Sequence, residues 1–105
     1  MKLLRAIIRP EREEAVIQQL EVVGLSSFTK IDVLGRGRQK GIQLGSITYD
    51  ELAKTQLLLV VDEAKVEAAI QAITQGARTG NFGDGKIFVS PVEQAFTIRT
   101  GKSEI

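Results

Sequence analysis

The sequence predicts an α+β sandwich whose elements follow the order β-α-β-β-α-β. Four short apolar runs are typical of strands, and two segments with apolar residues every three or four positions are typical of helices. One helix follows the first strand and the other follows the third. This order is that of a ferredoxin-like sandwich, here with a long loop between strands two and three and a short C-terminal extension. A chain of 105 residues is expected to form a single domain, residues 1–105.

The first half of the chain supplies a strand, a helix and a second strand. Residues 2–9 are predicted as a strand, and Pro10 suits the first position of a helix because an N–H there would have no helical partner. Acidic residues fill the first turn, where the helix dipole favours them. One face of the helix then carries the apolar residues Val16, Leu20 and Val23. Residues 28–33 follow as the second strand.

The second half repeats this order. Residues 57–61 are predicted as a strand whose apolar residues do not alternate, so both of its faces should be covered. The helix that follows carries on one face Val66, Ala69, Ile70 and Ile73. Residues 86–89 are predicted as the fourth strand, and residues 96–99 as a short final strand.

Two helices can cover only one face of such a sheet. The other face of residues 57–61 and 87–89 would then lie in water, and a contiguous apolar patch of that kind usually marks an interface. The sequence therefore predicts a homo-oligomer built on the open face of the sheet.

Composition excludes several classes of function. The chain has 14 Lys and Arg residues against 13 Asp and Glu, which argues against a dedicated binder of nucleic acid or of an anionic membrane. The absence of Cys and His removes disulfides, thiolate metal sites and the commonest general base. No signal peptide and no run long enough for membrane insertion are present, so a cytoplasmic protein is expected.

Residues 79–89, TGNFGDGKIFV, join a glycine-rich turn directly to a strand. Glycine permits a positive φ and close approach to the backbone, and successive N–H groups in such a turn can form an anion-binding concavity. Lys86 adds a point charge at the junction. The spacing of a P-loop is absent. On these residues alone, an ordinary glycine-rich hairpin turn is the favoured interpretation.

Residues 36–54 form a long connection that begins with the basic sequence RGRQKG. Apart from short strand extensions, this segment has no sustained period and is predicted as a loop. Loops longer than about 12–15 residues without secondary structure are uncommon and usually functional. The alternative is a disordered hairpin tip in which Arg36, Arg38 and Lys40 are solvated charges.

These features resemble the PII signal-transduction proteins over nearly the whole chain. The resemblance rests on the order of elements, on GRQKG at residues 37–41, on the segment 79–89 and on RTG at residues 99–101. Five further segments are most similar to the nitrogenase-associated subclass of methanogens and some bacteria: FTK (28–30), IDV (31–33), YDEL (49–52), SPVE (90–93) and TIRTGK (97–102). The chain is thus identified as a PII-like domain.

The resemblance implies a non-enzymatic homotrimer that binds ATP or ADP in clefts between neighbouring subunits. Arg99 would reach a phosphate from the neighbouring subunit. The remaining phosphate contacts would come from Gly83, Asp84, Gly85 and Lys86. The residues around the base would be Ile7, Thr29, Val60 and Thr79. The segment after the second strand would also approach the nucleotide through Gly35, Gly37, Arg38 and Gln39.

A second ligand, 2-oxoglutarate, is implied to chelate Mg²⁺ together with the ATP phosphates. Gln39 would ligate the metal, Lys54 would pair with a carboxylate, and the backbone near Lys40 and Gly41 would help. Mg²⁺ suits such a site because it prefers few protein oxygens plus phosphates. The long loop would touch a target through Ile42, Leu44, Ile47, Tyr49, Asp50 and Glu51. By resemblance, the target is a nitrogenase component protein, regulated together with a paralogous PII-like subunit.

Two departures from the family pattern bear on these expectations. Most members have a second Arg two residues before Arg99, where this chain has Thr97, so one phosphate contact is missing and the preference between ATP and ADP is open. The loop also lacks the tyrosine that enterobacterial members modify, so it should act without uridylylation. Whether Tyr49 or Ser46 is modified stays open.

Other functions are compatible with these residues. A PII-like regulator of an ammonium transporter or of glutamine synthetase would share them. A small nucleotide hydrolase would need Asp84, Glu51 or Asp50 as its base, because the chain has no His or Cys. An RNA-binding sheet would need exposed aromatic residues on its central strands, where residues 57–61 offer only Leu and Val.

Overall fold

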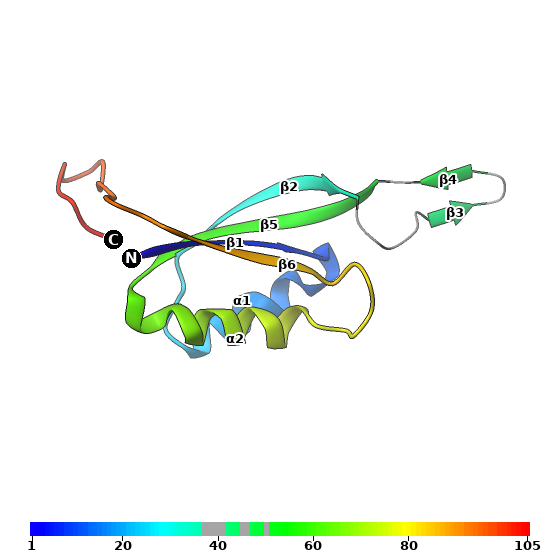
Figure 1. Ribbon diagram of the computed structural model, residues 1–105, viewed down its shortest axis with the longest axis horizontal. Helices are drawn as coiled ribbons and strands as arrows, with labels where there is room; N and C mark the ends of the chain where they lie inside the picture. Colours follow the sequence, from blue (N-terminus) through cyan, green and yellow to red (C-terminus); the bar gives the residue numbers. More distant parts are fainter. Residues whose placement is uncertain (37–41, 45–46, 50) are drawn as a thin grey trace.

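The computed structural model describes residues 1–36, 42–44, 47–49 and 51–105 (Figure 1). Its strands are β1 (Lys2–Ile8), β2 (Thr29–Gly35), β3 (Ile42–Leu44), β4 (Ile47–Tyr49), β5 (Leu52–Val61) and β6 (Gly85–Pro91). Its helices are the 3-10 turn η1 (Pro10–Arg12), α1 (Glu13–Val22), the 3-10 turn η2 (Glu63–Lys65) and α2 (Val66–Ala77).

The main sheet is antiparallel, with the strand order β2-β5-β1-β6, and α1 and α2 cover one of its faces (Figure 1). The predicted ferredoxin-like α+β sandwich is therefore confirmed. On β1, Leu4 lies opposite Leu59 of β5 and Val89 of β6. Because side chains alternate along a strand, each strand gives one set of residues to the helices and the other set to the open face.

The core lies between the sheet and the two helices. Every second residue of β1 and of the apolar half of β5 points into it, and α1 and α2 each contribute one apolar face. The buried set is Leu4, Ala6, Ile8, Val16, Leu20, Leu57, Leu59, Val61, Ala69, Ala72, Ile73 and Ala77. Each large aliphatic side chain buried in this way contributes about 1.5–3 kcal/mol to stability.

The two helices approach each other closely at Gly76. A Cβ placed there would lie 2.6 Å from the Cα of Val16 and 2.7 Å from its N atom, which leaves no room for a side chain. The Nε of Arg12 also donates to the Gly76 carbonyl at 2.8 Å. This position therefore fixes how α1 lies against α2.

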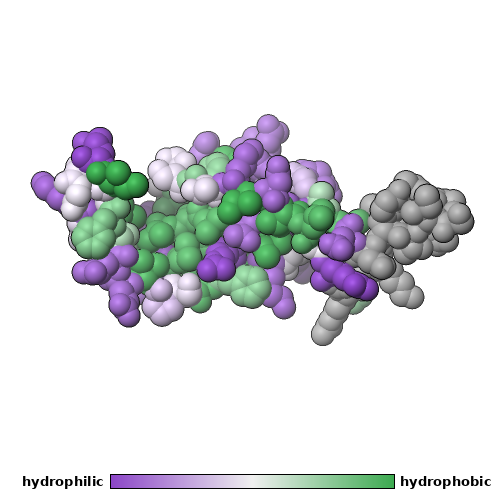
Figure 2. Space-filling model, turned by 90° about the horizontal axis from the view of Figure 1, so that it is seen from above, coloured by the Kyte–Doolittle hydropathy of each residue, from purple (hydrophilic) through white to green (hydrophobic). Residues whose placement is uncertain are grey.

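Within the described residues, no helix covers the opposite face of the sheet (Figure 1). Its central residues are Leu3, Arg5 and Ile7 of β1 and Gln56, Leu58 and Val60 of β5. Edge strands add Ile31 and Phe88, which are 46% and 50% exposed. Figure 2 looks onto this face and shows hydrophobic side chains gathered along its middle. The central strands present no aromatic side chain here, which argues against the RNA-binding interpretation.

The prediction for residues 36–54 was wrong in one respect. This segment contains a hairpin in which Ile42 pairs with Tyr49 and Leu44 with Ile47, and β5 already begins at Leu52. Strands of three residues are too short to show a periodicity in the sequence. They form because the two segments pair with each other.

The prediction of a final strand over residues 96–99 was also wrong. Only an isolated bridge between Phe96 and Ser103 is present. The N–H of Thr97 donates to the Lys102 carbonyl at 2.9 Å, and the N–H of Glu104 donates to the Ala95 carbonyl at 2.8 Å. The segment satisfies its backbone locally and so needs no partner in the main sheet.

Replacing Gly76 by Ala should destabilise the fold. Overpacking against the Val16 backbone should cost about 3 kcal/mol, and the better helix propensity of Ala returns only about 1 kcal/mol. Urea unfolding should therefore show a net loss of about 2 kcal/mol. Gln75→Ala, at the exposed preceding position, is the control and should change stability by less than about 0.5 kcal/mol. Equal stabilities for the two variants would contradict the close approach.

Candidate functional site

A cleft of about 670 Å³ opens where the glycine loop, residues 79–84, meets the main sheet. Ligand sites commonly have volumes of about 300–1,000 Å³. Its walls come from the glycine loop, from β6, and from the neighbouring ends of β1, β2 and β5. The lining residues are Ile7, Gly35, Arg36, Lys54, Asn81, Phe82, Gly83, Asp84, Gly85, Lys86 and Phe88.

Asp84 organises the glycine loop. Its Oδ2 accepts the N–H groups of Thr79 and Gly80, both at 2.8 Å, and its Oδ1 accepts the Thr79 hydroxyl at 2.5 Å. The Thr79 hydroxyl above all, with these N–H groups, holds the pKa of the Asp84 carboxyl well below its usual range. A carboxylate so stabilised is a weak base, which argues against Asp84 as the base of a hydrolase.

Two cations hold consecutive carbonyl groups of the glycine loop. The Nη2 of Arg9 donates to the Phe82 carbonyl at 2.7 Å, and the Nζ of Lys54 donates to the Gly83 carbonyl at 2.6 Å. Lys54 is only 8% exposed, and its burial, followed by repulsion from Arg9, lowers the pKa of its ammonium group. An anion that enters the cleft would offset both effects, so the arrangement favours negatively charged ligands.

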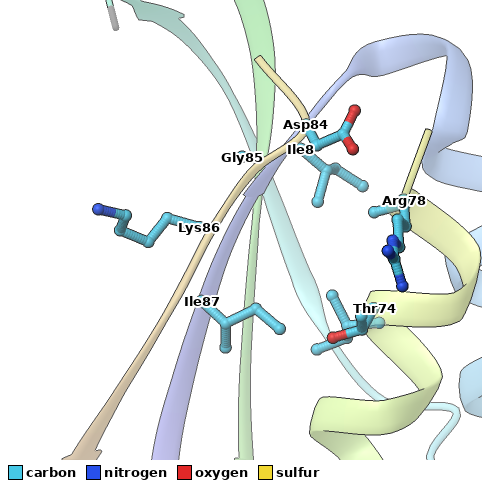
Figure 3. Close-up of a pocket in the computed structure, with 9 residues that line it drawn as sticks. Ile8, Thr74, Arg78, Asp84, Gly85, Lys86 and Ile87 are labelled. Carbon is cyan, nitrogen blue, oxygen red and sulfur yellow. The ribbon is translucent and has the colours of Figure 1, made fainter. Parts of the chain in front are cut away.

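Gly85 allows β6 to start directly beside β1. Its φ is +114°, and a Cβ there would lie 1.7 Å from the Ile7 carbonyl oxygen. Any other residue would force the two strands apart. The register then directs Lys86 toward the open face and Ile87 toward the helices, as Figure 3 shows.

A second cavity, of about 260 Å³, lies on the helix side of the same junction (Figure 3). Its apolar lining consists of Ile8, Ile73, Ala77 and Ile87, and Thr74 and Arg78 add polar groups. It shares with the larger cleft only Asp84, Gly85 and Lys86. The larger cleft gathers more of the predicted binding residues and is therefore the candidate site.

Comparison with known proteins identifies the family. The model of the family described as "Nitrogen regulatory protein P-II" matches residues 1–102. The chain belongs to the P-II family. The resemblance inferred from the sequence motifs is thereby confirmed.

Several P-II relatives resemble the chain over nearly its whole length. "Nitrogen fixation nifHD1 region GlnB-like protein 1" of Methanosarcina barkeri is 57% identical over 102 residues, 97% of each chain. "Nitrogen fixation nifHD region GlnB-like protein 1" of Methanothermobacter marburgensis is 54% identical over 100 residues, 95% of each chain. "Nitrogen regulatory protein P-II 2" of Methanothermobacter thermautotrophicus is 43% identical over 107 residues, 98% of this chain and 93% of the relative.

Part of the residues predicted to bind the nucleotide line the cleft of this P-II chain, namely Ile7, Gly35, Gly83, Asp84, Gly85 and Lys86. Lys54, which was predicted to bind 2-oxoglutarate, lines the same cleft. Thr79 supports the cleft indirectly, because its hydroxyl and its N–H donate hydrogen bonds to the Asp84 carboxylate. Val60 lies opposite Leu3, whereas Ile7 lies opposite Gln56. Val60 therefore lies four residues along β5 from Gln56, the partner of Ile7, which corresponds to about 13 Å along the strand.

Two other predicted residues also lie away from the cleft. Thr29 stands opposite Leu58, at the start of the edge strand β2. Arg99 belongs to the C-terminal segment, at the other end of the molecule from the glycine loop (Figure 1). A single copy of the chain therefore does not assemble the whole predicted set.

The rest of the predicted site lies wholly or partly outside the described residues. Nothing is described for Gly37, Arg38, Gln39, Lys40, Gly41, Ser46 and Asp50. The backbone only is described for Ile42, Leu44, Ile47 and Tyr49, which belong to the β3–β4 hairpin. Glu51 is exposed directly before β5. The roles assigned to these residues stay predictions.

Sequence reasoning missed some residues of the cleft and its support. Arg36, Asn81, Phe82 and Phe88 line the cleft, and Arg9 contacts the glycine loop from β1's end. Pairing β1 with the strand after the glycine loop would have revealed Arg9, because that register sets it beside residues 82–84. Among the described residues, no cluster of three or more acidic side chains could hold a metal ion. Nor is any helix in the described ranges long and apolar enough to cross a membrane.

Asp84 should make stability depend on pH. Its pKa is lower in the folded chain than in the unfolded chain, so its contribution is full above the ordinary carboxyl pKa of about 4 and is lost as the pH falls below it. The difference in unfolding free energy between the wild type and Asp84→Asn should therefore shrink as the pH is lowered from about 6 to about 3. Asp62→Asn, at an exposed position after β5, is the control. A difference that stays constant would contradict the assigned hydrogen bonds.

Proposed function

We propose that this P-II protein is a sensor that binds ATP or ADP and 2-oxoglutarate at the cleft and thereby controls a target protein. One observation carries the proposal: the glycine loop, Lys54 and Lys86 converge at the end of the β2–β5 pair that leads to the β3–β4 hairpin. The ligand site thus lies at the ends of β2 and β5, the two strands between which the hairpin stands in the sequence.

The chemistry of the cleft fits a nucleotide. Lys86 and the backbone of the glycine loop provide donors for phosphate oxygens, and Ile7, Phe82 and Phe88 provide an apolar surface. Phe82 is 69% exposed, so its ring is accessible to a ligand. An apolar surface with a few charged donors is typical of small-molecule sites.

The same cleft suits a dicarboxylate beside the phosphates. Lys54 is buried and cationic, so a carboxylate would compensate its charge. The described lining offers mainly donors, which fit anionic oxygens better than a cation. Mg²⁺ would therefore be held by oxygens of the ligands with the predicted help of Gln39, and it would offset part of their negative charge.

The complete site requires more than one copy of the chain. Thr29, Val60 and Arg99 lie away from the cleft in one copy. A homotrimer formed through the apolar open face would bring these residues to the cleft of a neighbour. Co-assembly with a paralogous P-II subunit would use the same face.

Ligand binding would then control the hairpin. Lys54 lies near the start of β5, so a ligand bound to it acts on the strand that directly follows the hairpin. A ligand can shift the equilibrium between two arrangements of the hairpin only if it binds one of them more tightly than the other. ATP with 2-oxoglutarate therefore favours one hairpin arrangement and releases a partner that needs the other. By linkage, the bound partner weakens 2-oxoglutarate binding by the same factor.

We propose a nitrogenase component protein as the target. The curated relatives with 57% and 54% identity carry names that refer to a nitrogen-fixation nifHD region. No described contact of the chain favours an ammonium transporter or glutamine synthetase instead.

Lys86→Ala should weaken ATP binding about tenfold or more, because a charge-assisted hydrogen bond contributes about 1.5–3 kcal/mol. Lys40→Ala is the charge-matched comparison, and its effect should be smaller. Isothermal titration calorimetry with ATP measures both. Small and equal effects would contradict the assigned phosphate site.

The target is tested by a pull-down of nitrogenase component protein with the chain and its paralogue in the presence of ATP, titrated with 2-oxoglutarate. The wild-type complex should dissociate, and the Lys54→Ala complex should persist. If 2-oxoglutarate leaves the wild-type complex intact, the proposed control of the partner by 2-oxoglutarate is wrong. The same holds if the wild-type and Lys54→Ala complexes dissociate at the same 2-oxoglutarate concentration. Capture of glutamine synthetase or an ammonium transporter in place of nitrogenase would overturn the target alone.

A further inference from the structure

Arg9 does not line the cleft, yet it makes contacts with two residues that do. We propose that Arg9 is a positioning residue that sets the donor geometry of the glycine loop for anion binding. Its Nη2 donates to the Phe82 carbonyl at 2.7 Å, and its Nε donates to Asp84 Oδ1 at 3.3 Å. One planar guanidinium thus holds the loop at two points, two residues apart.

The contact with Phe82 controls where a backbone donor points. A trans peptide directs its C=O and N–H to opposite sides, and the described chain contains no cis peptide. With the Phe82 carbonyl turned to Arg9, the N–H of Gly83 faces away from Arg9. The next carbonyl, of Gly83, is turned to Lys54. The two cations therefore fix the orientation of successive peptide groups beside the cleft.

The contact with Asp84 connects Arg9 to the rest of the loop. The same carboxylate accepts the N–H groups of Thr79 and Gly80. Arg9 therefore acts on both ends of the glycine loop, directly at Asp84 and through the Asp84 carboxylate at Thr79. An arginine can do this because its fork presents donors at fixed separate positions, whereas a lysine presents one point charge.

Arg9 is itself held by a rigid support. It follows β1, and its backbone is extended, with φ −65° and ψ 137°. The following Pro10 favours that conformation. The Arg9 carbonyl accepts the N–H of Arg12 at 3.0 Å and so ties the residue to η1. The backbone that carries the Arg9 side chain is therefore held in place by the strand and the turn on either side of it.

This inference rests on the proposed function, because it assigns the loop an anionic ligand. The test uses the full chain with three substitutions. Arg9→Met removes both contacts, and Arg9→Lys keeps the charge without the fork. Arg78→Met is the control, because it removes the same charge at the exposed end of α2 and leaves the Phe82 and Asp84 contacts in place.

Titration calorimetry with ATP should show binding about tenfold weaker for Arg9→Met, an intermediate loss for Arg9→Lys and a change of less than about twofold for Arg78→Met. Amide hydrogen exchange should speed up at Thr79 and Gly80 in Arg9→Met and stay unchanged at Leu4 and Leu57. Unchanged ATP binding in both Arg9 variants would overturn the inference. Weaker binding with equally faster exchange at Leu4 and Leu57 would also overturn it, because Arg9 would then serve only the stability of the fold.

A parallel titration with inorganic pyrophosphate separates this inference from the proposed function. Wild-type protein that binds pyrophosphate but not ATP would contradict the nucleotide proposal alone, and an effect of Arg9→Met on pyrophosphate binding would still support the inference. Wild-type protein that binds neither ligand would overturn both.

Discussion

The geometry of the candidate site depends on the pairing of β6 with β1 at Gly85. A side chain at this position would collide with the Ile7 carbonyl, so glycine alone lets the two strands meet here. That register brings the loop before β6 within reach of Arg9, which directly follows β1. It also sends Lys86 to the open face and Ile87 into the sandwich. One backbone contact thus sets the loop, its cationic support and the side on which a ligand can bind.

Hydrogen bonds and an ion pair within the chain offset part of the positive charge around the glycine loop. Arg9 and Lys54 would repel each other, but each donates to a carbonyl of the loop, and Asp84 supplies a full negative charge next to Arg9. Backbone carbonyls satisfy the hydrogen-bonding capacity of a buried cation without neutralising it. A ligand carboxylate that reached Lys54 would compete with the Gly83 carbonyl for its ammonium group.

The sequence predicted what local patterns determine. Short apolar runs identified the strands of the sandwich, and apolar residues at helical spacing identified its helices. It did not predict the β3–β4 hairpin, whose three-residue strands carry too little signal, or the local turn that replaces a strand at Phe96. The role of Arg9 depends on contacts 73 and 75 residues away in the chain, which no local pattern encodes.

We propose that each nucleotide site combines the cleft of one copy with Arg99 of another. Lys86→Ala and Arg99→Ala chains, each expected to bind ATP weakly, can be unfolded together and refolded as mixed oligomers. If the two residues come from neighbouring copies of a ring, about one cleft in four should carry both and bind ATP with wild-type affinity in calorimetry. A mixture that binds only weakly, like the two separate variants, would contradict a site shared between copies.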